Sequence, residues 1–183
     1  MKAVIQRVKS ASVTVDGQLI SSIGKGLLIL AAIAKEDTAK EAESMASKVL
    51  KVKLWDDDQG GKWKKNVQEI DGEVLCVSQF TLLASTKKGN KPSFHASADA
   101  AKGKELYDLF FGQVRKLYRE DRVKDGVFQA MMDVGLVNDG PVTIEIDTNP
   151  PKMDNPSGFQ TPDSETFKGH MHKTFEYPAE LLE

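Results

Sequence analysis

The chain has 183 residues, of which 40% are hydrophobic and 28% are charged, and its formal net charge is −2. This length favours one well-buried domain, and no apolar run reaches the roughly 18 residues that a membrane span needs. The small negative charge argues against broad phosphate-driven binding of nucleic acid, although it leaves room for a small basic patch. The single cysteine, Cys76, excludes a disulfide within the chain and is expected to be a buried, inert thiol.

The chain opens with strand-like sequence. Three short strands are expected, over residues 2–8, 11–16 and 18–23, the last two joined by the turn Asp16-Gly17. Because no long apolar stretch of a secretory signal precedes them, we expect a cytoplasmic protein. The longest apolar run, 26–34, follows Gly24-Lys25-Gly26 and suits a strand buried on both faces. The glycine pair is read as a turn, because no Gly-Lys-Ser/Thr follows to complete a phosphate loop.

Two helices are expected further along the chain. Thr38 and Glu41 form a capping box, after which apolar residues recur on one helical face. The second helix is expected over 99–118, with Leu106, Leu109, Phe110, Val114 and Leu117 facing inward. Residues 73–83 read as a buried strand, 127–137 as one or two strands and 142–147 as the last strand. Many strands with two helices indicate an α+β fold, in which mixed/antiparallel sheets form a partial barrel with both helices packed outside.

The sequence changes character after Asp147. Prolines are scattered among Asn, Asp, Ser, Gly and Thr, and no hydrophobic period survives. We therefore expect a domain over 1–147 and a Pro-rich C-terminal extension over 148–183 that is partly disordered or surface-bound. Aromatic side chains that could anchor parts of this extension are Phe167, Phe175 and Tyr177.

Neither metal binding nor a cofactor is predicted. The acidic run 56–61 resembles a calcium loop, but Gly60 stands at its fifth position and Val67 at its twelfth, so a solvated hairpin loop is favoured. His170 and His172 have a spacing that could bind a metal weakly, but no cysteine lies nearby. His95 has no nucleophile elbow around it, so a Ser-His-Asp triad is not predicted either.

Two segments could carry chemistry through the main chain. Gly140-Pro141 stands just before the alternating strand 142–147 and would present bare carbonyls in a stiff geometry, although an ordinary turn is the alternative. The run 78–81, Ser-Gln-Phe-Thr, ends a buried strand, where released N–H groups could stabilise an oxyanion. Polar side chains that simply meet water are the alternative there. A basic loop with Lys87, Lys88 and Lys91 follows, which could hold phosphates or be a solvated turn.

Taken together, these segments resemble the D-aminoacyl-tRNA deacylase family over residues 1 to about 147. The motifs that carry the resemblance are Ser78-Gln79-Phe80-Thr81-Leu82, Lys91-Pro92-Ser93-Phe94, Leu136 to Thr143, Ile5-Gln6-Arg7-Val8 and Ala11 to Val15. They occur in the family's order and spacing. Two departures are the lack of an expected methionine near Gly61-Lys62 and a tail that is longer than the compact bacterial form and looks like a eukaryotic extension.

The resemblance implies an enzyme that hydrolyses the ester of D-aminoacyl-tRNA, and also of glycyl-tRNA, as a chiral proofreading step. It implies a homodimer that binds the tRNA acceptor end, with Gly140-Pro141, in the cis form, reaching into the partner subunit's site. Residues 78–81 would be catalytic, Arg7 would brace the Gly-Pro segment as part of the chiral filter, and the three lysines would contact tRNA.

The nucleophile stays open at this point. The family is thought to use the terminal 2′-hydroxyl of the tRNA, and direct attack by Thr81 is the alternative, although no base is adjacent to it in sequence. Three other functions also remain: a non-catalytic module that binds the tRNA acceptor end, a synthetase-type L-aminoacyl editing domain, and a purely structural dimer.

Overall fold

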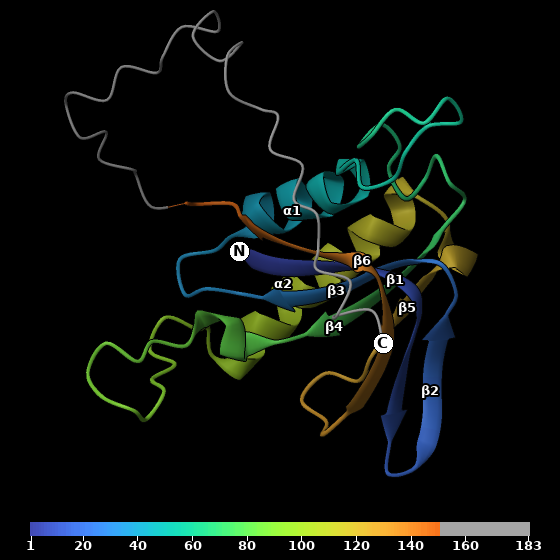
Figure 1. The fold of residues 1–183 in the computed structure, drawn as a ribbon. Coiled ribbons are helices and arrows are strands. Elements are labelled where there is room, and N and C mark those ends of the chain that lie inside the picture. Colours follow the sequence, from blue (N-terminus) through green and yellow to red (C-terminus); the bar gives the residue numbers. More distant parts are fainter. Residues whose placement is uncertain (151–183) are drawn as a thin grey trace, which may run out of the picture. The chain divides into compact units, whose positions relative to one another are not determined.

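One sheet of six strands organises residues 1–150, the part of the chain that this computed structural model describes (Figure 1). The strands are β1 (Lys2–Val15), β2 (Gln18–Ile23), β3 (Gly26–Ala32), β4 (Glu73–Ser78), β5 (Val123–Asp125) and β6 (Asp133–Asp147). The helices are α1 (Ala39–Lys51) and α2 (Ala100–Leu117), with short 3₁₀ helices η1 (Phe80–Leu83) and η2 (Glu120–Arg122).

The long strand β1 is the axis of this sheet. Strand β6 pairs antiparallel with β1 from Lys2 to Thr14, so it occupies one edge over both halves of β1. On the other edge, β3 pairs with residues 2–8 and β2 with residues 11–15. Strands β4 and β5 then add to β3 in parallel. The result is a mixed sheet, nearly closed into a barrel, which confirms the α+β prediction.

The sheet buries side chains on both of its faces. Along β3, Leu27, Ile29 and Ala31 belong to the core shared with α1 and α2, whereas Leu28 belongs to a second cluster with Val8, Val13, Leu75 and Val77. Figure 1 shows the two helices lying together on one side of the strands. The apolar run 26–34 is therefore explained as predicted, by a strand covered on both faces.

Helix α1 begins where the capping box was predicted. The Glu41 carboxylate accepts hydrogen bonds from the N–H and the hydroxyl of Thr38, at 2.9 and 2.6 Å. These bonds lower the pKa of Glu41. Its apolar face is buried as expected, through Ala42, Met45, Ala46, Val49 and Leu50.

Several predicted boundaries were wrong. Residues 2–8 and 11–16 belong to one strand, because β6 pairs with both halves of β1, from Lys2 to Thr14. Likewise, 127–137 and 142–147 are replaced by the single strand β6, which begins only at Asp133. Gly140-Pro141 therefore lies inside a strand and not in a turn before one. Irregularities in the pairing between Gln6 and Ser10 accommodate a proline, which has no N–H to offer the ladder.

Other differences concern the ends of elements. The strand predicted over 73–83 ends at Ser78, because the chain turns into η1 at Phe80. Leu117, predicted to face inward from α2, is 47% exposed, and Tyr107 is buried from the same helix. Strand β5 has three residues, too few for a periodic pattern, and was not predicted. The predicted anchors and histidines of the extension lie outside the described residues.

Candidate active site

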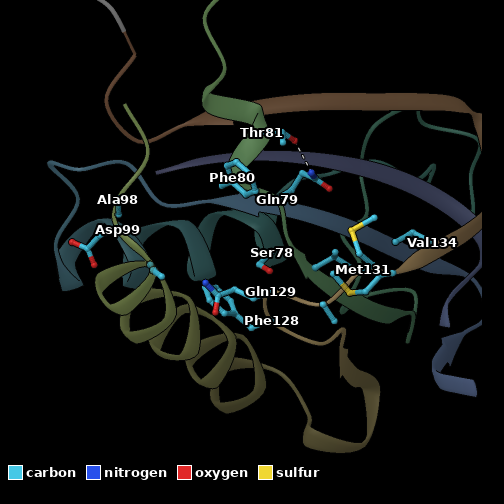
Figure 2. A pocket seen from close by; sticks show the side chains of 15 residues that line it. Ser78, Gln79, Phe80, Thr81, Ala98, Asp99, Phe128, Gln129, Met131 and Val134 are labelled. Atoms are coloured by element: carbon cyan, nitrogen blue, oxygen red, sulfur yellow. Dashed lines mark hydrogen bonds between the residues drawn. The ribbon is translucent and has the colours of Figure 1, made fainter. Parts of the chain in front are cut away.

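A pocket of about 690 Å³ opens where β4 gives way to η1 (Figure 2). Residues 77–81 form one wall, the beginning of α2 a second, and the segment 128–134 a third. Its volume is in the range of small-molecule and cofactor sites. All four residues of the predicted catalytic run line it: Ser78, Gln79, Phe80 and Thr81.

The backbone at this wall leaves the sheet where strand β4 ends and the helix η1 begins. Ser78 is the last residue of β4 and lies level with Ala31, whose carbonyl accepts the Gln79 N–H at 2.7 Å. Phe80 and Thr81 then form the first turn of η1, where N–H groups have no partner inside the helix. The residues that carry these two backbone donors line the pocket.

The Thr81 hydroxyl is held by a neighbour that is not a base. It accepts a hydrogen bond of 2.5 Å from the Gln79 side-chain amide, drawn as a dashed line in Figure 2. His95 hydrogen-bonds to Ser93 at 3.0 Å, but both side chains are exposed. Within residues 1–150, no carboxylate hydrogen-bonds to His95, and no imidazole or carboxylate to Thr81. The site therefore lacks a formed nucleophile and base pair of side chains in the described part of the chain.

The other walls were missed by the sequence analysis. Phe128 lies 5.9 Å from the Tyr107 ring and 5.7 Å from the Lys104 ammonium. Gly103 lines the pocket from α2, and a Cβ added there would lie 3.8 Å from Phe128. The only sequence signal was a glycine inside a helical pattern, which often has a packing reason. Met131, 91% exposed, stands in the segment between β5 and β6.

A half-buried carboxyl, Asp125, is linked to this wall through Tyr107. The Tyr107 hydroxyl donates a 2.6 Å hydrogen bond to Asp125, which anchors the ring that contacts Phe128. Burial raises the pKa of the Asp125 carboxyl, because the charged form is poorly solvated there. Burial likewise raises the pKa of the Cys76 thiol, as expected for an inert cysteine.

The Gly140-Pro141 segment is held by Arg7 from the neighbouring strand. The Arg7 Nε donates to the Asp139 carbonyl at 3.0 Å and lies 3.3 Å from the Asp139 carboxylate. Arg7 also donates to the Leu54 carbonyl through Nη1. The Gly140-Pro141 peptide bond is cis, and Gly140 has a φ of +131°, which favours glycine.

Within one copy of the chain, this segment and the pocket do not meet. In the register of the sheet, Ser78 of β4 pairs with Ala31 of β3, which in turn pairs with Ala3 of β1. Gly140 of β6 lies opposite a different part of β1, around Arg7. Four residues along β1 correspond to about 13 Å, and the three spacings from β6 to β4 add about 14 Å across the sheet. Neither Gly140 nor Pro141 is among the residues that line the pocket.

The predicted tRNA contacts lie on a separate hairpin. Ser85 and Ser93 close it through paired backbone hydrogen bonds of 2.8 and 2.9 Å. Lys87, Lys88 and Lys91 are exposed within it and are not among the residues that line the pocket.

Two further properties concern residues 1–150 as a whole. No helix in this part of the chain is long and apolar enough to cross a membrane. The same residues contain no group of three or more His, Cys, Asp or Glu side chains that could hold a metal ion.

Comparison with known proteins identifies the class of protein to which this fold and pocket belong. The family model described as D-Tyr-tRNA(Tyr) deacylase matches residues 4–147. The chain therefore belongs to this family, whose members are hydrolases. The predicted resemblance is confirmed.

Individual relatives agree with this assignment. D-aminoacyl-tRNA deacylase of Yarrowia lipolytica is 55% identical over 150 residues, which cover 81% of this chain and 97% of that protein. D-aminoacyl-tRNA deacylase 1 of Homo sapiens is 48% identical, with 82% of this chain and 72% of that protein covered. A solved structure titled "c-Myc DNA Unwinding Element Binding Protein" is 48% identical, with a TM-score of 0.79, and the match covers 82% of this chain and 100% of that one.

Proposed function

We propose that this chain hydrolyses the ester that joins a D-amino acid, or glycine, to the 3′ end of tRNA. One observation carries the proposal: the pocket wall at 78–81 offers backbone donors, while neither of its hydroxyl groups, on Ser78 and Thr81, is hydrogen-bonded to a base within residues 1–150. An aminoacyl ester is already activated, so it needs polarisation of its carbonyl more than a strong protein nucleophile. The N–H groups of Phe80 and Thr81 would supply that polarisation, at about 3–4 kcal/mol for each donor.

The nucleophile would then come from the substrate. The 2′-hydroxyl of the terminal ribose is adjacent to the ester and is bound in place with it, so it reacts without a separate ordering step. Thr81 would stay a hydrogen-bond acceptor of Gln79 and would not attack. A threonine nucleophile is the alternative mechanism.

The pocket would hold the terminal adenosine of the tRNA. Phe128 and Phe80 offer aromatic surfaces for a base, and Gly103 lines the pocket from α2 without a side chain of its own. Stacking on aromatic side chains is a common way to bind an unpaired base. Lys87, Lys88 and Lys91, which are exposed on the hairpin, would contact phosphates of the acceptor stem.

Chiral selection would need a second copy of the chain. Gly140-Pro141 lies too far from the pocket of its own subunit, so in a homodimer it would enter the partner subunit's pocket. The Gly140 and Pro141 carbonyls would bind the substrate ammonium and turn the Cα hydrogen of a D-residue toward the protein. An L-residue would direct its Cβ there instead, and glycine, which has no Cβ, would be accepted.

A competing function is a module that binds the acceptor end, or edits L-aminoacyl-tRNA, without D-specific hydrolysis. The backbone donors of η1 together with the Arg7-braced Gly140 favour the deacylase, because a binding module needs neither. We expect the protein to act in the cytoplasm.

The test is to incubate the protein with D-tyrosyl-tRNA and L-tyrosyl-tRNA and to follow loss of the ester. We expect release from the D-substrate only, with glycyl-tRNA also cleaved. No release from the D-substrate, or equal release from both stereoisomers, would refute the proposal. Sedimentation analysis of the same sample should report a dimer.

A further inference from the structure

We propose that Trp63 is a positioning residue of the chiral filter, which acts by covering the guanidinium of Arg7. The Arg7 Cζ lies over the Trp63 ring, 6.0 Å from its centroid. Trp63 is nevertheless 52% exposed, which is unusual for so large an apolar side chain. This inference rests on the proposed function of Gly140-Pro141.

The loop that carries Trp63 is built to hold one conformation. The Asp57 carboxylate accepts hydrogen bonds from the N–H groups of Gln59, at 3.0 Å, and Gly61, at 2.7 Å. Backbone pairing between Trp55 and Lys65 closes the base of the loop. Trp63 itself has a φ of +56°, an outlier for a bulky residue, and such strain is concentrated at functional sites.

Arg7 is where this loop and the Gly-Pro segment meet. Its side chain is 17% exposed and donates to carbonyl groups on both sides, of Leu54 and of Asp139. A Cβ added to Gly140 would lie 3.1 Å from Arg7 Nη2, so the guanidinium is packed against the glycine. Any shift of the guanidinium would therefore be felt at Gly140.

Trp63 supplies what the hydrogen bonds of Arg7 do not. Those bonds lie in the plane of the guanidinium, whereas an aromatic face restrains the plane from one side and attracts its charge. Trp63 thus fixes Arg7, Arg7 fixes Asp139, and Asp139 adjoins the glycine of the filter.

The experiment compares Trp63→Ala, Trp63→Leu and Trp63→Phe with wild type, as full-length protein, on D-tyrosyl-tRNA and L-tyrosyl-tRNA. Lys64→Ala is the control, because Lys64 is a neighbouring exposed residue that has no role in this proposal. We expect the D-to-L ratio of kcat/KM to fall about three- to tenfold in the Ala and Leu variants and to stay near wild type in the Phe variant. Thermal unfolding of each variant separates loss of fold from loss of selectivity.

The outcomes are distinct. A D-to-L ratio that is unchanged in Trp63→Ala, or that falls equally in Trp63→Phe and Trp63→Leu, would overturn the role of Trp63. A wild-type protein that does not discriminate between the stereoisomers would instead refute the proposed function. If Trp63→Ala does not fold, Trp63→Leu, which keeps apolar bulk but has no π face, decides the matter.

Discussion

Replacing Gly140 by alanine tests the filter most directly. The glycine has a φ of +131°, a conformation that costs a non-glycine residue about 1–3 kcal/mol. The new Cβ would lie 2.9 Å from Val142 Cγ2 and 3.1 Å from Arg7 Nη2. Ordinary contacts begin near 3.4 Å, so both neighbours must give way by about 0.3–0.5 Å. We expect Gly140→Ala to lower the free energy of unfolding by about 2–4 kcal/mol.

The same displacement should lower selectivity, separately from its effect on stability. Misplacement of a positioning group by 1 Å can cost about 10²-fold in rate. The displacement expected at Gly140 is about 0.3–0.5 Å, so the D-to-L ratio should fall about tenfold. The assay is ester release from both tyrosyl-tRNA stereoisomers, followed below the melting temperature of the variant.

A matched control is available in the hairpin between β1 and β2. Gly17 also has a positive φ, +78°, but a Cβ added there meets nothing within 4 Å. Gly17→Ala should therefore lose about 1–2 kcal/mol of stability with no change in selectivity. If the two variants lose selectivity equally, or if neither does, the argument that the Gly140 contact with Arg7 sets selectivity is wrong.

Three further predictions concern the pocket and the Asp125 carboxyl. Thr81→Ala should keep activity within about tenfold, and a loss beyond about 10⁴-fold in a folded variant would favour a threonine nucleophile. Gly103→Leu should lower kcat/KM at least about tenfold by filling the pocket, whereas Gly112→Leu, at an open position of the same helix, should not; equal kinetics would contradict the adenosine site. Asp125→Asn keeps an acceptor for Tyr107 without a charge. Because burial raises the folded-state pKa of Asp125 above 3.8, wild type loses stability as the pH rises through that pKa, so the melting temperature of Asp125→Asn relative to wild type should be higher at pH 7 than at pH 4. A constant difference across that range would refute this account.

The sequence predicted best where a local pattern has one physical solution. The capping box at Thr38 forms its hydrogen bonds within four residues, and it appears in the structure as expected. The apolar run 26–34 can only be a buried segment, and it appears as the buried strand β3. The run 78–81 was located correctly at the end of a buried strand, because polar residues after apolar ones mark where a strand leaves the core.

The failures came from pairing between distant segments. Gly140-Pro141 has the local signature of a turn, but pairing with β1 on both sides of it, at Thr143 and at Asn138, keeps it inside β6. The sequence analysis missed two walls of the pocket for a related reason. Gly103 and Phe128 lie on different elements, and only the packing of α2 against the end of the sheet brings them together. No spacing along the chain encodes that proximity.

In the proposed homodimer, the distance between Gly140 and Ser78 has a consequence for mixed assemblies. When two halves of a site reside on different subunits, a chain defective in the filter and a chain defective in the pocket carry complementary defects. A mixed dimer of the two would contain one doubly damaged site and one intact site. Co-expression of a chain that has lost selectivity with a chain that has lost hydrolysis should then restore D-selective hydrolysis at one site, a form of complementation that a site contained within one subunit cannot show.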